Sequence, residues 1–268
     1  MSESISHYVI KKDSVRLNSG GFRAVFLSDM HNRIWRDDID YEISMIEAQM
    51  PDIILCGGDM IEAKPGLENR NLQNAAFFLR KLSEKYRIYH ALGNHEYRMK
   101  IYPETYGSMY DEYMEALSGC DIVWLDNESV DIEVNSIPVT LYGLSITRKY
   151  YKRFDKVKLP VSFINKAVGE PKKDRFNILL AHHPRYAGAY LNWGADLALC
   201  GHYHGGVMRL KGNRGLVSPD PSIFTHTAHG CIEKNGKNVI ISAGMGEHTI
   251  PFRIRNPREI IVIDTEIW

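Results

Sequence analysis

The chain has 268 residues, and its 33 Lys and Arg balance its 33 Asp and Glu, so the formal net charge is zero. This balance argues against a protein built to bind polyanions, because such proteins usually carry a clear basic excess. A hydrophobic fraction of 44% and a charged fraction of 25% are typical of a soluble globular protein and exclude a disordered chain.

The cysteines and the N-terminus indicate a cellular compartment. The four cysteines, Cys56, Cys120, Cys200 and Cys231, are widely separated and form no CxxC pair, which excludes a disulfide framework and a thiolate zinc site. We expect Cys56 and Cys200, which end apolar runs, to be buried as small hydrophobic residues. The N-terminus lacks a signal-peptide pattern, and no run approaches the roughly 18 apolar residues of a membrane helix. We therefore expect a cytoplasmic protein without a membrane span.

Short apolar runs recur along the chain and predict β-strands. They span residues 7–10, 22–27, 52–56, 86–92, 121–125, 137–144, 176–181, 195–200, 238–242 and 259–264. Between the early runs, apolar residues at three- and four-residue spacings predict helices over 38–50, 71–84 and 106–117. Hairpin turns are predicted at Asn135-Ser136, Lys211-Gly212-Asn213 and Lys234-Asn235-Gly236-Lys237.

No linker composition divides the chain. We expect a single α/β domain over residues 1–268. Its core would be a two-sheet β-sandwich flanked by helices, because two layered sheets with helices outside use all the predicted strands.

Potential metal ligands directly follow five of the predicted strands. These are Ser28-Asp29-Met30-His31, Gly57-Gly58-Asp59, Gly93-Asn94-His95-Glu96, His182-His183-Pro184 and Gly201-His202-Tyr203-His204-Gly205-Gly206. In layered α/β folds, ligands bind beyond the carboxyl ends of the strands, so these residues point to one site.

The spacing of the ligands suggests how they share this site. In an extended segment, residues two apart project to the same side, so Asp29 and His31 could reach one ion together, and His202 and His204 one cavity. Oxygen and imidazole donors without thiolate favour Mn, Fe, Zn, Co or Mg.

In this order, the motifs D-x-H, GD, GNHE, H-x-P and GHxHGG resemble those of the calcineurin-like metallophosphoesterase superfamily. The resemblance covers the chain from Arg23 to about Trp268. The tail, with Gly244-Met245-Gly246 and Asn256-Pro257-Arg258-Glu259-Ile260, is similar to the bacterial single-domain branch, whose members hydrolyse phosphodiesters or phosphomonoesters.

The resemblance implies a site for two divalent metal ions, among which we favour Mn. Asp29, His31 and His204 would bind the first ion. Asn94, His182 and His202 would bind the second, and Asp59 would bridge the two. His95 would lie beside the substrate phosphate, where it would neutralise developing charge and protonate the leaving group. The bridging water would lose a proton and attack phosphorus in line.

Several further residues carry expectations of their own. His182 is preferred over the adjacent His183 as ligand, because the family pattern has one residue between this His and Pro184. The basic segment 147–158 could bind an anionic substrate or nucleic acid, but the interpretation as a solvated surface loop is favoured. Arg33, Trp35 and Arg98 could line a substrate cleft, and Glu96 is expected to support the His95 loop by hydrogen bonding.

The resulting functional prediction is a phosphoester hydrolase, with phosphodiesters favoured over phosphomonoesters. The substrate would be a small-molecule, lipid or nucleotide phosphoester, and nucleic acid is not favoured. One alternative is a pyrophosphatase that acts on a sugar-nucleotide lipid. Another is a binding scaffold that has lost catalysis, which is disfavoured because every ligand position is filled. The sequence does not indicate an oligomeric state.

Overall fold

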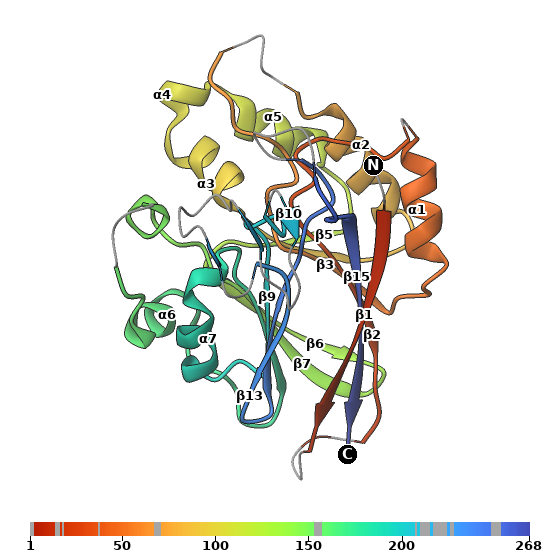
Figure 1. Cartoon of the computed structure of the whole chain (residues 1–268), viewed down its shortest axis with the longest axis vertical. Helices are drawn as coiled ribbons and strands as arrows, with labels where there is room; N and C mark the ends of the chain where they lie inside the picture. The colour runs from red at the N-terminus through yellow and green to blue at the C-terminus, as the bar shows by residue number, and fades with distance from the viewer. Residues whose placement is uncertain are drawn as a thin grey trace.

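The computed structural model describes residues 3–13, 17, 19–36, 38–66, 71–152, 157–206, 208–209, 215–216, 224–225, 228–247 and 253–268. Two six-stranded mixed sheets form the centre of the molecule (Figure 1). Sheet I has the spatial order β1 (Glu3–Lys12), β15 (Arg258–Ile267), β2 (Arg23–Leu27), β3 (Ile53–Cys56), β4 (Ile88–Ala91) and β5 (Ile122–Leu125). Sheet II has the order β13 (Gly230–Lys234), β14 (Lys237–Ile241), β9 (Leu197–Cys200), β8 (Phe176–Leu180), β7 (Ile137–Gly143) and β6 (Glu128–Val134).

Helices lie outside both sheets. On the side of sheet I, the chain forms α1 (Ile39–Glu47), α2 (Gln73–Ser83), α3 (Asn94–Ile101), α4 (Pro103–Tyr106) and α5 (Met109–Ala116). The later part of the chain forms η2 (Arg148–Tyr151), α6 (Val161–Val168), η3 (Pro184–Tyr186) and α7 (Ala187–Trp193). A small third sheet joins β10 (Met208–Arg209), β11 (Gly215–Leu216) and β12 (Phe224–Thr225).

Strand alternation separates three apolar layers. On β2, Val25 and Leu27 pack toward the helices of sheet I, whereas Ala24 and Phe26 pack between the two sheets. On the other side, Leu179 belongs to the layer between sheet II and helices α6 and α7. Because successive side chains on a strand point to opposite faces, strands buried on both faces read as continuous apolar runs. This is why the central strands were predictable.

The predicted two-sheet α/β/β/α architecture is confirmed, and each predicted strand and helix overlaps an observed one. The turns at Asn135-Ser136 and Asn235-Gly236 join β6 to β7 and β13 to β14, with the positive φ angles that tight hairpins need. The turn predicted at 211–213 lies outside the described residues. Helices α3, α4, α6 and α7 and strands β6 and β13 were not predicted.

Cys56 and Cys200 are fully buried, as predicted. Among the described residues, the helices are short, and none has the length and hydropathy that a bilayer-spanning segment requires.

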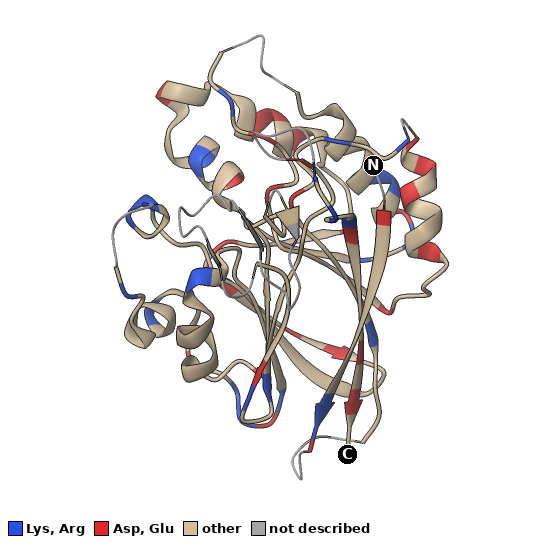
Figure 2. Cartoon of the chain, viewed as in Figure 1, with Lys and Arg blue, Asp and Glu red and all other residues tan. Residues whose placement is uncertain are grey.

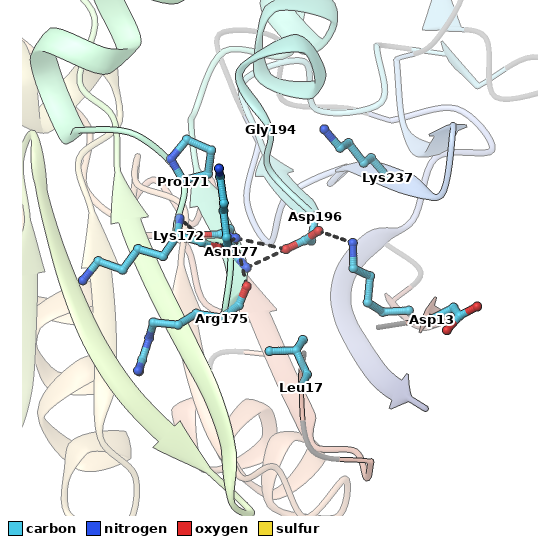
Figure 3. Close-up of a pocket in the computed structure, with 11 residues that line it drawn as sticks. Asp13, Leu17, Pro171, Lys172, Arg175, Asn177, Gly194, Asp196 and Lys237 are labelled. Atoms are coloured by element: carbon cyan, nitrogen blue, oxygen red, sulfur yellow. Dashed lines mark hydrogen bonds and ion pairs between the residues drawn. The ribbon is translucent and has the colours of Figure 1, made fainter. Parts of the chain in front are cut away.

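A salt bridge joins the two sheets at the end opposite the carboxyl ends of β2 and β9. Figure 3 shows the carboxylate of Asp196 and its bonds to Asn177. The Nζ of Lys12, the last residue of β1, lies 2.7 Å from Oδ1 of Asp196, which precedes β9. Oδ2 of Asp196 accepts hydrogen bonds from the backbone N–H of Asn177 at 2.8 Å and from its side chain at 3.2 Å. These groups line a cavity of about 520 Å³.

Candidate metal centre

The loops that follow β2, β3 and β4 of sheet I meet those that follow β8 and β9 of sheet II. These strands are parallel within each sheet, so their carboxyl ends lie at one end of the sandwich. The residues with converging ligand atoms form three overlapping groups, each within 4.8 Å: Asp29, His31 and His204; His31, Asp59 and His95; and Asp59, His182 and His202. The site therefore spans both sheets.

In the first group, His31 Nε2 lies 3.1 Å from His204 Nε2, and His204 Nε2 lies 3.4 Å from Asp29 Oδ1. The other ring nitrogen of His204, Nδ1, lies 3.2 Å from the carbonyl oxygen of Gly246. Nη2 of Arg253 also lies 3.4 Å from Nδ1. With a proton on Nδ1 donated to the carbonyl, the Nε2 lone pair would face the group. This arrangement suits a metal ligand.

The group of Asp59, His182 and His202 shows a similar arrangement. His182 donates from Nδ1 to the carbonyl oxygen of Gly57 at 2.8 Å, which leaves Nε2 facing Asp59 Oδ2 at 3.0 Å. The side-chain amide of Asn94 lies 2.8 Å from His202 Nδ1. Without a cation the amide donates to that nitrogen, and rotation about the amide turns its oxygen toward a cation instead.

The backbone at this site differs from the sequence prediction. Asp29 and His31 have φ angles of 54° and 48°, and His202 and His204 have 69° and 50°. Each pair therefore lies in left-handed turns and not in the extended segments that we predicted. Left-handed backbone costs roughly 1–2 kcal/mol per non-glycine residue, and such strain is concentrated at functional sites. Asp59, with φ 55°, shares this conformation.

Glycine allows the β3 and β4 loops to touch. A Cβ added to Gly58, which has φ +88°, would lie 1.9 Å from the backbone nitrogen of Gly93. Only glycine permits this close approach.

Glu96 clamps the same two loops. Its carboxylate accepts from the backbone N–H of Asp59 at 2.8 Å, Met60 at 2.8 Å and Gly93 at 3.0 Å. The predicted supporting role of Glu96 is thus confirmed.

His95 is oriented as a donor. Its Nδ1 accepts the backbone N–H of Ala63 at 2.7 Å, so in the neutral ring the proton is on Nε2. Nε2 lies 3.8 Å from Asp59 Oδ2. A protonated Nε2 can donate to a phosphoryl oxygen, whereas a metal ligand must offer a lone pair. In this tautomer Nε2 carries a proton and offers no lone pair to the group of His31, Asp59 and His95.

The buried carboxylates and imidazoles strongly perturb one another. Burial disfavours charge on Asp59, but His182 and His95 outweigh it and hold the pKa of this carboxyl well below its usual range. Burial also opposes charge on His182, yet Asp59 and Asp29 raise its pKa to about 10. A site that stabilises extra positive charge on an imidazole is electrostatically suited to cations.

The remaining predicted residues divide between the site and its surroundings. His183 is buried outside the three groups, and its ring centroid lies 4.5 Å from that of His202. Arg98 donates from Nε to the Asn94 carbonyl at 3.1 Å, so it borders the site. Trp35 is fully buried, with Nε1 bonded to the Met245 carbonyl at 2.7 Å, which contradicts the cleft role. Arg33 is exposed, and residues 153–156 of the basic segment lie outside the described residues.

Sequence reasoning missed residues that hold the ligands in place. Ser28 donates from Oγ to Asp29 Oδ2 at 2.5 Å, a role that its position before the ligand could have suggested. The Asn256 amide donates to the carbonyls of His204 and Gly206, both at 2.6 Å. Tyr151, beside His183, had no signal beyond its place in the basic segment.

The comparisons with known proteins indicate the family of the chain. The family model of the calcineurin-like phosphoesterases matches residues 22–206, which is most of the chain. A metallophosphoesterase of Caenorhabditis elegans is 32% identical over 198 residues, 71% of this chain and 38% of that protein. One of Aquifex aeolicus is 26% identical over 240 residues, 88% of this chain and 82% of that protein. The chain thus spans well under half of the first relative and most of the second.

Among solved structures, the calcineurin-like phosphoesterase YfkN of Bacillus subtilis has a TM-score of 0.51 and 15% identity, covering 85% of this chain and 82% of that one. This likeness concerns the fold. The chain belongs to the calcineurin-like phosphoesterase family, a class of metal-dependent phosphoester hydrolases. The donor set of carboxylate, amide and imidazole fits the divalent metals that this class uses.

Proposed function

We propose that the chain is a phosphodiesterase that works with two divalent metal ions. The observation that carries the proposal is the position of Asp59, whose carboxylate belongs to two groups of converging ligand atoms. In this proposal Asp29, His31 and His204 hold one ion, while Asn94, His182 and His202 hold the other, and Asp59 is shared.

The metal ions would polarise the phosphoryl oxygens and activate a water molecule for attack on phosphorus. The protein's own contribution begins with His95. Its Nε2–H can donate to a phosphoryl oxygen or to the leaving oxygen, because its Nδ1 is fixed by the backbone of Ala63. Glu96 holds Asp59 and His95 in position relative to each other, because it accepts hydrogen bonds from the loops that carry them.

We further propose Mn²⁺ as the metal and a small-molecule, lipid or nucleotide phosphodiester as the substrate. The mixed oxygen and imidazole donors support Mn²⁺, which accepts both ligand types. The preference for a diester rests on the similarity of the tail, residues 244–260, to the bacterial single-domain branch.

The test combines metal analysis with a substrate panel. Purified protein loaded with Mn²⁺ is expected to hold two equivalents and to cleave bis-p-nitrophenyl phosphate faster than p-nitrophenyl phosphate. Cyclic nucleotides and sugar-nucleotide lipids complete the panel. Faster cleavage of the pyrophosphate bond in a sugar-nucleotide lipid would favour the pyrophosphatase alternative, and the absence of turnover in fully loaded protein would contradict the proposal.

The variant His95→Asn separates the roles around the site. Because His95 is proposed to contact substrate and not metal, the variant should keep two metal equivalents. The rate of the chemical step should fall by about 10²–10⁴-fold, the usual contribution of a positioned acid. Loss of a metal ion in this variant would instead identify His95 as a ligand.

A further inference from the structure

Tyr151 lies beside the half of the metal centre that contains His202. It is the last residue of η2, which follows β7 of sheet II. Its ring stacks on His183, with centroids 5.0 Å apart and an interplanar angle of 28°. It also meets the ring of His202 edge-on, with centroids 5.4 Å apart and an angle of 77°. These contacts fix the ring next to a proposed metal ligand.

Among the described residues, the hydroxyl of Tyr151 differs from those of Tyr186 and Tyr190 in its hydrogen bonding. Tyr186 donates its hydroxyl to the carbonyl of Tyr150 at 2.8 Å, and Tyr190 donates to the carbonyl of His183 at 2.8 Å. Within the described part of the chain, the Tyr151 hydroxyl has no hydrogen-bond partner, and this side chain is only partly buried. Tyrosine hydroxyls in such packed surroundings normally find a partner, so solvent or a ligand fills this position.

Two arginines lie on the elements that border this side of the site, Arg148 on η2 and Arg98 on α3. Arg98 lies on α3, and a further contact joins this region to η2, because the Arg148 guanidinium lies 5.8 Å from the ring centroid of Tyr102. Figure 2 shows basic residues on both η2 and α3. These arginines bring positive charge to the side of the site where the Tyr151 ring packs on His202, which suits an anionic ligand.

We propose that the Tyr151 hydroxyl donates a hydrogen bond to a phosphoryl oxygen of the substrate. The inference rests on the proposed function, and it adds a second donor on the side opposite His95. The ring of His95 packs on His31, with centroids 4.9 Å apart, whereas Tyr151 packs on His183 and His202. The two donors thus flank the shared carboxylate of Asp59 from the two halves of the site.

The variant Tyr151→Phe removes only the hydroxyl and keeps the ring that stacks on His183. Tyr150→Phe is the matched control, because Tyr150 is the neighbouring residue of η2 and its buried ring packs on Phe163 and Tyr186. Both variants are loaded with Mn²⁺, and their metal content is measured by elemental analysis. The affinity for inorganic phosphate is then measured by calorimetry, with bis-p-nitrophenyl phosphate kinetics in parallel.

Tyr151→Phe is expected to keep the metal content of the unmodified protein, to bind phosphate about tenfold more weakly and to lose about tenfold in kcat/KM. This is the range for one hydrogen bond to a charged acceptor. Tyr150→Phe should match the unmodified protein. Unchanged phosphate affinity in Tyr151→Phe would overturn the inference, and so would loss of metal, which would make Tyr151 a support for His202.

The phosphate measurement keeps this inference separate from the proposed function. If the unmodified protein cleaves none of the phosphoesters but its phosphate binding depends on Tyr151, the inference stands and the proposed activity fails. If metal-loaded protein binds no phosphate, both are wrong.

Discussion

At the scale of single residues, Asp59 is the member that two of the potential ligand groups share, His31 with His95 and His182 with His202. It lies 3.0 Å from His182 Nε2, accepts the backbone N–H of His95 at 2.7 Å and is almost fully buried. Replacing it with Asn keeps the shape and removes the charge.

We expect Asp59→Asn to lower the bound metal from two equivalents to one or none, because a neutral amide cannot offset charge from two cations. Phosphoesterase activity should fall by at least about 10³-fold, the scale of losing a key electrostatic contact. Elemental analysis and a phosphodiester assay measure both effects. A variant with full metal content and full rate would refute the shared role of Asp59.

A second residue, Glu42 on α1, makes stability depend on pH. Its side chain is fully buried, and Oε1 accepts the backbone N–H of Trp35 at 2.7 Å, whereas Oε2 has no partner among the described residues. Burial raises the pKa of Glu42 from 4.5 to about 8. The folded state therefore holds this proton at pH values where the unfolded chain has released it.

The sign of the effect follows from linkage. The stabilising contribution of protonated Glu42 is complete below about pH 4.5 and disappears as the pH rises through about 8. The free energy of unfolding of metal-stripped protein is measured with urea at pH 5.5 and at pH 8.5. Between these two pH values, it should fall by about 2 kcal/mol more in the unmodified protein than in Glu42→Gln, after allowance for solvent screening. Equal pH slopes in the two proteins would show that Glu42 is ionised throughout.

At the scale of elements, burial explains which predictions succeeded. Strands β3 and β8 are buried along their whole length, so their apolar runs were plain in the sequence. Strand β6 at the edge of sheet II combines exposed and partly buried residues over Glu128–Val134. Its exposed positions are polar, so the segment forms no apolar run and was not predicted as a strand. Helix α3 begins within the Asn94-His95-Glu96 motif and has little amphipathic pattern of its own.

The site was predictable in its residues and not in its backbone. Asp29, Asp59 and His202 were recognisable because they follow apolar strands, and parallel strands bring such positions together. Their left-handed φ angles depend on contacts from other loops, such as the backbone N–H of His202 that donates to Asp29 Oδ1 at 2.9 Å. The stacking of Tyr151 on His183 likewise depends on how η2 packs on the loop after β8, and no local sequence pattern indicates this packing.

The clamp at the start of α3 gives an element-scale prediction. Replacement of Glu96 with Ala leaves the buried N–H groups of Asp59, Met60 and Gly93 without their acceptor. We expect a loss of about 3 kcal/mol in the free energy of unfolding, together with weaker metal binding, because unpaired buried donors cost about 1–3 kcal/mol each. Urea unfolding and elemental analysis measure the two effects.

Glu104→Ala is the matched control for the clamp, because Glu104 is exposed on the adjacent α4. It should change stability by less than about 0.5 kcal/mol. If Glu96→Ala behaved like this control, the two loops would have to be held by other contacts, and the clamp would be dispensable.

At the scale of the whole molecule, the two sheets are joined at both ends. The metal centre draws on the β2, β3 and β4 loops of sheet I and the β8 and β9 loops of sheet II, while Lys12 and Asp196 join the sheets at the other end. Between them lies one apolar layer with residues from both sheets, such as Phe26 and Ile178. We therefore propose that residues 1–268 unfold as one domain, with fluorescence and circular dichroism giving coincident urea transitions.

The variant Asp196→Ala tests the salt bridge between Lys12 and Asp196 without changing a residue of the candidate metal centre. Asp196 is buried, and its removal leaves the Asn177 N–H unpaired and Lys12 without its counter-charge. We expect a loss of about 3 kcal/mol, seen as a lower urea midpoint at unchanged slope, with the metal content of the unmodified protein retained. Asp131→Ala, which breaks the half-exposed pair with Lys172 on sheet II, should cost less than about 1 kcal/mol. If Asp196→Ala instead split the transition into two steps, the sheets would be separate folding units held together by this pair.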